Sequence, residues 1–140
     1  MSAQVPDSED DVTAGVLIIG DEILSGRTRD RNTGTIAGHL TAIGIALREV
    51  RVVPDDTDEI VAAVNALRQR YSYVFTTGGI GPTHDDLTAD SIGKAFGVPV
   101  EVDPKAVAMM EPVYKARGIE LTPARLRMAR VPEGAELIAN

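Results

Sequence analysis

The sequence predicts an α/β domain, a three-layer α/β/α sandwich around a mostly parallel sheet. Short apolar runs, typical of buried strands, alternate with longer stretches of helical periodicity. This alternation is the pattern of parallel sheets that helices cover on both faces. Glycine and proline mark most of the junctions between these segments. The chain has 140 residues, which is enough for one domain with its own core.

The N-terminal part supplies the first strand and helix. Residues 1–13 are acidic and polar, so we expect a disordered lead-in, followed by one domain over residues 14–140. Residues 16–19 are all apolar and lie between glycines, as in a strand buried on both faces. A polar loop, residues 20–27, precedes a helix over about 32–43, where apolar residues recur at helical spacing.

The second strand and helix have clear boundaries. Residues 46–53 are predicted as a strand that Pro54 ends. Asp56, with Glu59 three residues later, is typical of a helix N-terminus in which both side chains satisfy backbone donors. Apolar residues at helical spacing then predict a helix that packs one face against the sheet.

A third strand and helix follow, and then a short edge strand. Residues 73–76 form the predicted strand, and residues 88–96 form a helix that Gly97 ends. Residues 98–102 predict a further short strand, which Pro99 restricts to the edge of a sheet.

The C-terminal part predicts two more helices. The first begins at Asp103 and ends before Gly118, with Pro112 expected to kink or shorten it. A short helix begins at Thr122 and reaches about residue 129. Residues 137–138 are expected to begin a last strand.

Composition excludes several classes of function. The formal net charge of −7 argues against nonspecific nucleic-acid binding, which depends on basic patches. The sequence contains no cysteine, so disulfides and thiolate metal sites are ruled out. No apolar run approaches the roughly 20 residues of a membrane span, so we expect no membrane contact. A cytoplasmic location fits these features.

Three loops are predicted to meet at one edge of the sheet. In parallel α/β sheets the ligand lies outside the carboxyl ends of the strands. The loops that leave those ends are residues 20–27, 54–56 and 77–86, and each of them carries acidic residues. We therefore expect the functional site at this edge.

The third loop is rich in glycine. Gly78, Gly79 and Gly81 allow close backbone approach, and their N–H groups, with the N-terminus of the following helix, could bind an anion. The motif is neither a P-loop nor a dinucleotide fingerprint. The alternative is a tight strand-to-helix turn that binds no ligand.

Two adjacent carboxylates, Asp85 and Asp86, follow the glycines. One of them, or Thr83, could cap the next helix, but neighbouring like charges disfavour each other. A divalent cation would relieve this repulsion, since Mg²⁺ typically uses one or two carboxylates together with substrate phosphates. Asp55 supports this hypothesis because Asp56 already caps its helix, which leaves Asp55 without an expected structural role.

Other charged residues have simpler interpretations. Asp21 and Glu22 follow a buried strand in the same way as Asp55, with solvated loop acids as the alternative. A solvated helix face is the expectation for Arg125, Arg127 and Arg130.

Three motifs carry a family resemblance: IGDEILSG at residues 19–26, VPD at 53–55 and TTGGIGPTHDDLT at 76–88. They resemble the molybdopterin-binding domain of molybdenum cofactor biosynthesis proteins. The opening GDEIL and the ending DDLT are most similar to the N-terminal domain of the CinA family, and a similar domain occurs in eukaryotic FAD synthases. The resemblance covers residues 14–140 and implies a three-layer α/β fold with a pocket for a pterin or nucleotide phosphate.

The resemblance also implies chemistry. In molybdopterin adenylyltransferases the aspartate before Leu/Val-Thr is required, which corresponds to Asp86, and the aspartate after the strand-ending proline corresponds to Asp55. CinA-like domains are linked to metal-dependent cleavage of ADP-ribose, and the FAD synthase relatives to FAD hydrolysis. We therefore predict hydrolysis of a nucleotide pyrophosphate. The alternatives are molybdopterin adenylyltransfer and a non-catalytic module that binds a pterin or nucleotide.

The candidate site follows from these arguments. We expect Asp55 and Asp86 to be catalytic, and Asp55, Asp85 and Asp86 to bind a divalent metal, Mg²⁺ or possibly Co²⁺. Molybdopterin is a possible ligand. The residues expected to bind phosphate or pterin are Gly20, Asp21, Glu22, Thr77, Gly78, Gly79, Gly81, Pro82, Thr83 and Thr88.

The resemblance carries two further expectations about assembly and extent. It implies a homo-oligomer, a dimer or a trimer. Family members continue with a Gly- and Pro-rich segment that closes the pocket, so we expect residues 14–140 to lack the last segment of the domain.

Overall fold

The computed structural model describes residues 11–139. The predicted lead-in therefore lies mostly outside the described residues, and the first strand begins at Thr13. No helix in the described part of the chain is long and apolar enough to cross a membrane. The elements in chain order are β1 Thr13–Ile19, α1 Asp21–Leu24, α2 Asn32–Ala42, β2 Ala46–Val53, α3 Thr57–Arg70, β3 Tyr73–Thr77, α4 Thr88–Phe96, β4 Val100–Val102, α5 Pro104–Ala116, α6 Pro123–Leu126, the 3₁₀ helix η1 Arg127–Ala129 and β5 Arg130–Pro132.

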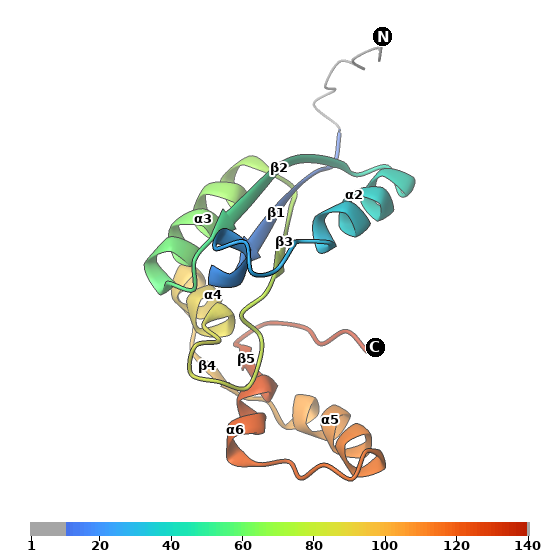
Figure 1. Ribbon diagram of the computed structural model, residues 1–140, viewed down its shortest axis with the longest axis vertical. Helices are drawn as coiled ribbons and strands as arrows, with labels where there is room; N and C mark the ends of the chain where they lie inside the picture. Colours follow the sequence, from blue (N-terminus) through green and yellow to red (C-terminus); the bar gives the residue numbers. More distant parts are fainter. Residues whose placement is uncertain (1–10, 140) are drawn as a thin grey trace.

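The main sheet is parallel and has the strand order β2-β1-β3. Its central strand β1 is buried from Ala14 to Ile19, as its apolar sequence predicts for a strand covered on both faces. Figure 1 shows α2 and α3 on opposite faces of this sheet. The predicted α/β architecture with a parallel sheet between helices is therefore confirmed.

The core lies between the sheet and α3. Leu17 from β1 packs with Ile60 and Leu67 from α3, and all three residues are fully buried. Asp56 caps α3 as predicted, because its carboxylate accepts a hydrogen bond from the Glu59 N–H at 3.0 Å. The predicted return bond to the Glu59 side chain is replaced, since the Asp56 N–H donates to the Pro54 carbonyl at 2.8 Å. This cap and the buried helix face fix α3 against the sheet.

A smaller C-terminal unit, residues 100–132, extends the domain beyond α4. Strand β4 pairs antiparallel with β5, and α5, α6 and η1 lie between them in the chain. Figure 1 shows this unit projecting below α4, away from the main sheet. Helix α4 connects the two parts, since it packs against α3 on one side and contacts β4 and β5 on the other.

Three predictions of secondary structure were wrong. Residues 137–138 form no strand, and the last strand is β5 instead. The first residue of β5, Arg130, forms an ion pair with the distant Asp90, which the local sequence does not reveal. Of the two effects expected from Pro112, shortening of α5 is wrong because the helix continues to Ala116, and a kink stays a prediction. The loop predicted over residues 20–27 contains the single helical turn α1.

We expect Leu67→Ala to lower the free energy of unfolding by about 2–5 kcal/mol, the usual cost of a cavity in a packed core. Leu67 is fully buried, whereas Leu24 is 55% exposed. Urea unfolding of Leu67→Ala and of the control Leu24→Ala measures the difference. Equal losses in the two variants would contradict the assignment of the core.

Candidate functional site

The glycine-rich loop packs tightly against the end of β1. Gly78 and Gly79 have positive φ angles of 91° and 64°. A Cβ atom on Gly78 would lie 2.0 Å from the Ile19 carbonyl oxygen, and one on Gly79 would lie 2.3 Å from the Thr88 hydroxyl. Thr88 fixes the loop because its hydroxyl donates to the Gly78 carbonyl at 2.7 Å and its N–H donates to the Gly79 carbonyl at 3.1 Å. Both glycines are therefore required by the fold itself.

Asp86 folds back onto this loop and does not cap α4. The N-cap residue of α4 is Leu87, and no side chain makes a capping bond there, so the predicted cap from Thr83, Asp85 or Asp86 was wrong. One oxygen of Asp86, Oδ2, instead accepts hydrogen bonds from the Thr83 N–H at 2.9 Å and the Thr83 hydroxyl at 2.8 Å. The Thr83 N–H, which we had expected to bind a ligand, therefore donates to the Asp86 carboxylate instead.

The surroundings of Asp86 keep it ionised. Burial alone would raise the pKa of its carboxyl group, but hydrogen bonds from Thr83 and from the Gly81 N–H, together with the charge of Arg127, lower that pKa below the usual value. A side chain on residue 81 would also be excluded, because a Cβ atom there would lie 2.7 Å from Asp86 Oδ2. Asp86 therefore acts as an anionic anchor for the loop.

Asp55 and Asp21 join the loops that follow β2 and β1. The Asp21 N–H donates to Asp55 Oδ2 at 3.0 Å, and the Asp55 N–H donates to Asp21 Oδ1 at 3.1 Å. The Gly20 N–H adds a bond to the Val53 carbonyl at 3.0 Å. The expectation that Asp55 has no structural role was therefore wrong. Its backbone partner lies 34 residues away, which local reasoning could not reveal.

The carboxyl edge of the sheet brings the beginnings of the three predicted loops together. The Asp21–Asp55 pair lies where β1 and β2 end, and Gly78 packs on Ile19, the last residue of β1. Glu22 covers Gly20, since a Cβ atom on that glycine would lie 2.5 Å from a Glu22 carboxylate oxygen. The edge therefore combines acidic side chains with the start of the glycine-rich loop.

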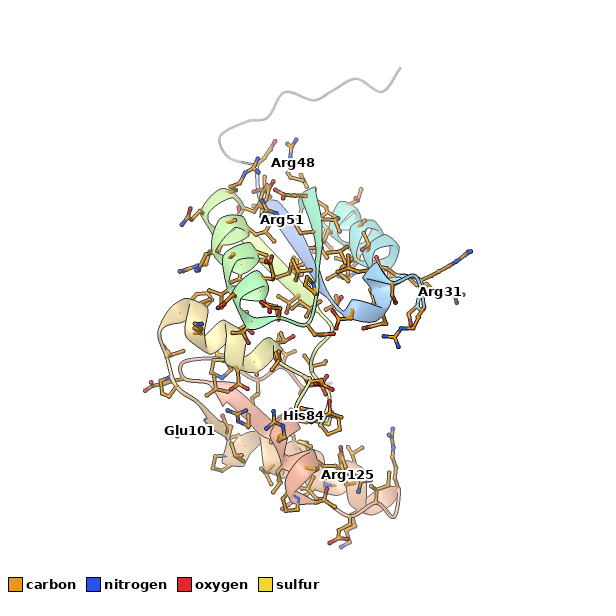
Figure 2. All side chains as sticks on the ribbon, turned by 60° about the vertical axis from the view of Figure 1, so that its left-hand side comes forward. Arg31, Arg48, Arg51, His84, Glu101 and Arg125 are labelled. Atoms are coloured by element: carbon orange, nitrogen blue, oxygen red, sulfur yellow. The ribbon has the colours of Figure 1, made fainter. Side chains whose placement is uncertain are left out.

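The predicted metal ligands have different partners. Asp55 is held by Asp21, Asp86 is held by Thr83, and the 81% exposed side chain of Asp85 lies 3.3 Å from His84. Figure 2 shows His84 on the loop that extends from the sheet toward the C-terminal unit. Within residues 11–139, no three His, Cys, Asp or Glu side chains are grouped as a metal site. The shared metal site stays a prediction.

A small cavity of about 100 Å³ lies between the glycine-rich loop, α4 and the C-terminal unit. Two of the arginines predicted on a solvated face, Arg127 and Arg130, line it instead and are only partly exposed. Arg130 donates to both oxygens of Asp90 at 3.0 and 2.7 Å, an ion pair between segments 40 residues apart. A larger cavity of about 320 Å³ lies along β4 and β5 and contains no predicted site residue.

A family model described as "Probable molybdopterin binding domain" matches residues 15–131. The chain belongs to this molybdopterin-binding domain family. A related protein from Pyrobaculum arsenaticum is 41% identical to this chain over 127 residues. One from Saccharolobus islandicus is 41% identical to it over 128 residues. Those alignments cover 91% of this chain but 48% and 49% of the relatives, so the chain spans about half the length of the curated relatives it matches.

Solved structures agree with the family. CinA from Thermoplasma acidophilum is similar with a TM-score of 0.77 and 39% identity, over 86% of this chain and 70% of that protein. The tungsten cofactor synthesizing protein MoaB from Pyrococcus furiosus has a TM-score of 0.59 and 24% identity, over 79% and 68% of the two chains. The second likeness shows the fold alone. The resemblance to molybdopterin-binding and CinA-like domains is thereby confirmed.

We expect Gly78→Ala to destabilise the domain by several kcal/mol, because a methyl group there collides with backbone and the φ angle of 91° is unfavourable. Gly34 is the matched control, since it lies in α2 and a Cβ atom there meets open space. Gly34→Ala should raise stability by up to about 1 kcal/mol. Thermal and urea unfolding compare the variants, and a harmless Gly78→Ala would refute the close packing.

The lowered pKa of Asp86 predicts a pH-dependent contribution to stability. This contribution is fully present above the ordinary carboxyl pKa of 3.8 and is lost as pH falls through the lower folded-state value. Asp86→Asn should therefore cost roughly 1 kcal/mol at neutral pH and progressively less below pH 3.8. Urea unfolding across pH measures this, with the exposed Asp85→Asn as control. A cost that does not change with pH would contradict the assignment.

Proposed function

We propose that this domain binds a nucleotide through its phosphate groups at the carboxyl edge of the sheet and hydrolyses a pyrophosphate such as that of ADP-ribose. A small-molecule pterin is the ligand that the family description names. The observation that supports the proposal is the reciprocal Asp21–Asp55 pair beside the glycine-rich loop. This arrangement places two carboxylates next to a backbone that approaches closely enough to contact phosphate oxygens.

The carboxylate pair fits a divalent cation. Asp55 uses Oδ2 and Asp21 uses Oδ1 in the reciprocal bonds, so the other oxygen of each carboxylate is not used in this pair. Mg²⁺ typically takes one or two carboxylates together with substrate phosphates. The cation would supply charge neutralisation and an activated water. It would also offset the net charge of −7, which otherwise repels a pyrophosphate.

The residues of the chain have separate roles in this proposal. Asp55, and Asp21 with it, hold the cation, while the loop from Gly78 to Thr83 positions the phosphates. Water adds to one phosphorus as the bridging P–O bond breaks. The leaving phosphate takes the electron pair of that bond, and the proton of the water passes to solvent or to the leaving phosphate. Asp86 orders the loop through Thr83 and is a positioning residue.

The proposal is tested by incubating the protein with ADP-ribose, with FAD, and with molybdopterin plus ATP, each with and without Mg²⁺ or Co²⁺. We expect AMP and ribose 5-phosphate from ADP-ribose only when metal is present. Adenylylated molybdopterin would favour adenylyltransfer, and binding without turnover would favour a non-catalytic module. The expected homo-oligomer and cytoplasmic location also stay predictions.

Asp55→Asn should lower metal-dependent turnover by roughly 100-fold or more, a loss typical of a catalytic group. The amide can still accept from the Asp21 N–H, so the fold is retained and the charge is lost. Asp56→Asn is the matched control, because Asn caps a helix about as well as Asp. Steady-state kinetics with Mg²⁺ compare the two variants. Equal losses would show that the neighbouring aspartates had been assigned the wrong roles.

A further inference from the structure

We propose that Arg127, in the C-terminal unit, binds one phosphate group of the ligand in the cavity beside the glycine-rich loop. This proposal rests on the proposed function, because it names a second contact for the same pyrophosphate. It also assigns a role to residues 100–132, which contain none of the motifs that carry the family resemblance.

The hydrogen bonding of Arg127 is incomplete. Its Nε atom is buried, and it has no hydrogen-bond partner among residues 11–139. Buried polar groups are almost always paired in native proteins, and an arginine N–H left without an acceptor needs an explanation. Arg130, which lines the same cavity, shows the contrast because it bonds to both Asp90 oxygens and to the Val100 carbonyl. The Nε donor of Arg127 is therefore left without an acceptor from the described part of the chain.

The cavity has the size of a single anionic group. Its volume is about 100 Å³, whereas pockets for whole small-molecule ligands span about 300–1,000 Å³. The lining includes the backbone of Gly79 to Gly81, which can approach a phosphate closely. Arginine suits this role because its planar fork of donors matches phosphate oxygens.

The cavity is lined by two carboxylates and two arginines, and within residues 11–139 only one of the arginines is held by a direct ion pair. Asp90 is neutralised by the two bonds from Arg130. Asp86 carries a charge near Arg127, but its Oδ2 already accepts two bonds from Thr83. Arg127 makes no ion pair within 4 Å in the described part of the chain, so no carboxylate there holds its guanidinium directly.

One continuous loop connects this cavity with the carboxyl edge of the sheet. Gly78 packs on Ile19 at that edge, and the next residues, Gly79 to Gly81, line the cavity. A ligand with two linked phosphates can therefore contact the loop at the edge and Arg127 in the cavity. The substrate class that follows is a diphosphate.

Calorimetric titration with inorganic pyrophosphate and with ADP-ribose, in EDTA to prevent turnover, tests this proposal. We expect Arg127→Gln to weaken both affinities at least tenfold. Arg125→Gln is the matched control, since Arg125 lies in the same unit and bonds to the Glu120 carbonyl outside the cavity. Its affinities should equal those of the wild type. Unchanged affinity in a folded Arg127→Gln variant would overturn the proposal, even if its stability fell.

A second measurement keeps the proposal testable if Arg127→Gln does not fold. The Nε–H signal of Arg127 in nitrogen NMR, assigned by its absence in Arg127→Lys, should shift when wild-type protein is saturated with pyrophosphate. An unmoved signal at saturation would overturn the proposal.

The outcomes separate this proposal from the proposed function. Arg127-dependent binding without metal-dependent hydrolysis would support the Arg127 contact and reject the hydrolase. Hydrolysis that persists with unchanged affinity in Arg127→Gln would support the hydrolase and reject the Arg127 contact. A wild-type protein that binds neither pyrophosphate nor ADP-ribose in EDTA would overturn the Arg127 contact, while hydrolysis in the presence of metal would still decide the proposed function.

Discussion

The close contact between the glycine-rich loop and the end of β1 is the constraint on which the site depends. Position 78 lies so close to the Ile19 carbonyl that only a residue without a Cβ atom fits there. Thr88 then donates hydrogen bonds to the carbonyls of Gly78 and Gly79. These bonds set where α4 begins, and α4 in turn carries the C-terminal unit. The turn therefore fixes both the carboxyl edge and the distant cavity. Its glycines serve the fold first, and ligand binding uses a shape that the fold has already imposed.

The acidic residues of the site are held by backbone donors, which explains how several carboxylates lie close to the glycine-rich loop. Asp21 and Asp55 each accept from the other's N–H, and Asp86 accepts from Thr83. For Asp86, these bonds and the charge of Arg127 lower the pKa of the carboxyl group against the effect of burial. The structure thus separates two kinds of aspartate. One kind joins loops at the sheet edge, where we propose that a cation binds, and the other orders the glycine-rich loop.

Local signals predicted most of the fold, because caps and glycine stops act within a few residues. Asp56 capped α3 and Gly97 ended α4 as the sequence indicated. The site depends on partners far apart in the chain, and there the sequence was less informative. The reciprocal bonds of Asp55 join residues 34 apart, and the ion pair of Arg130 with Asp90 spans 40. No periodicity or capping pattern encodes such pairs. The sequence therefore indicated no structural partner for Asp55 and placed Arg127 and Arg130 on a solvated helix face.

The arginines also change the electrostatic account of the site. A net charge of −7 requires local positive charge before a pyrophosphate can bind. From the sequence, a metal at the carboxylates was the favoured source, since the arginines of the C-terminal part were expected to face solvent. The fold supplies another source, because Arg130 neutralises Asp90 and leaves Arg127 beside the same loop. A cation at Asp55 and a guanidinium in the cavity would then each offset one phosphate of a diphosphate. Because the guanidinium is always charged, its contribution would persist when metal is removed.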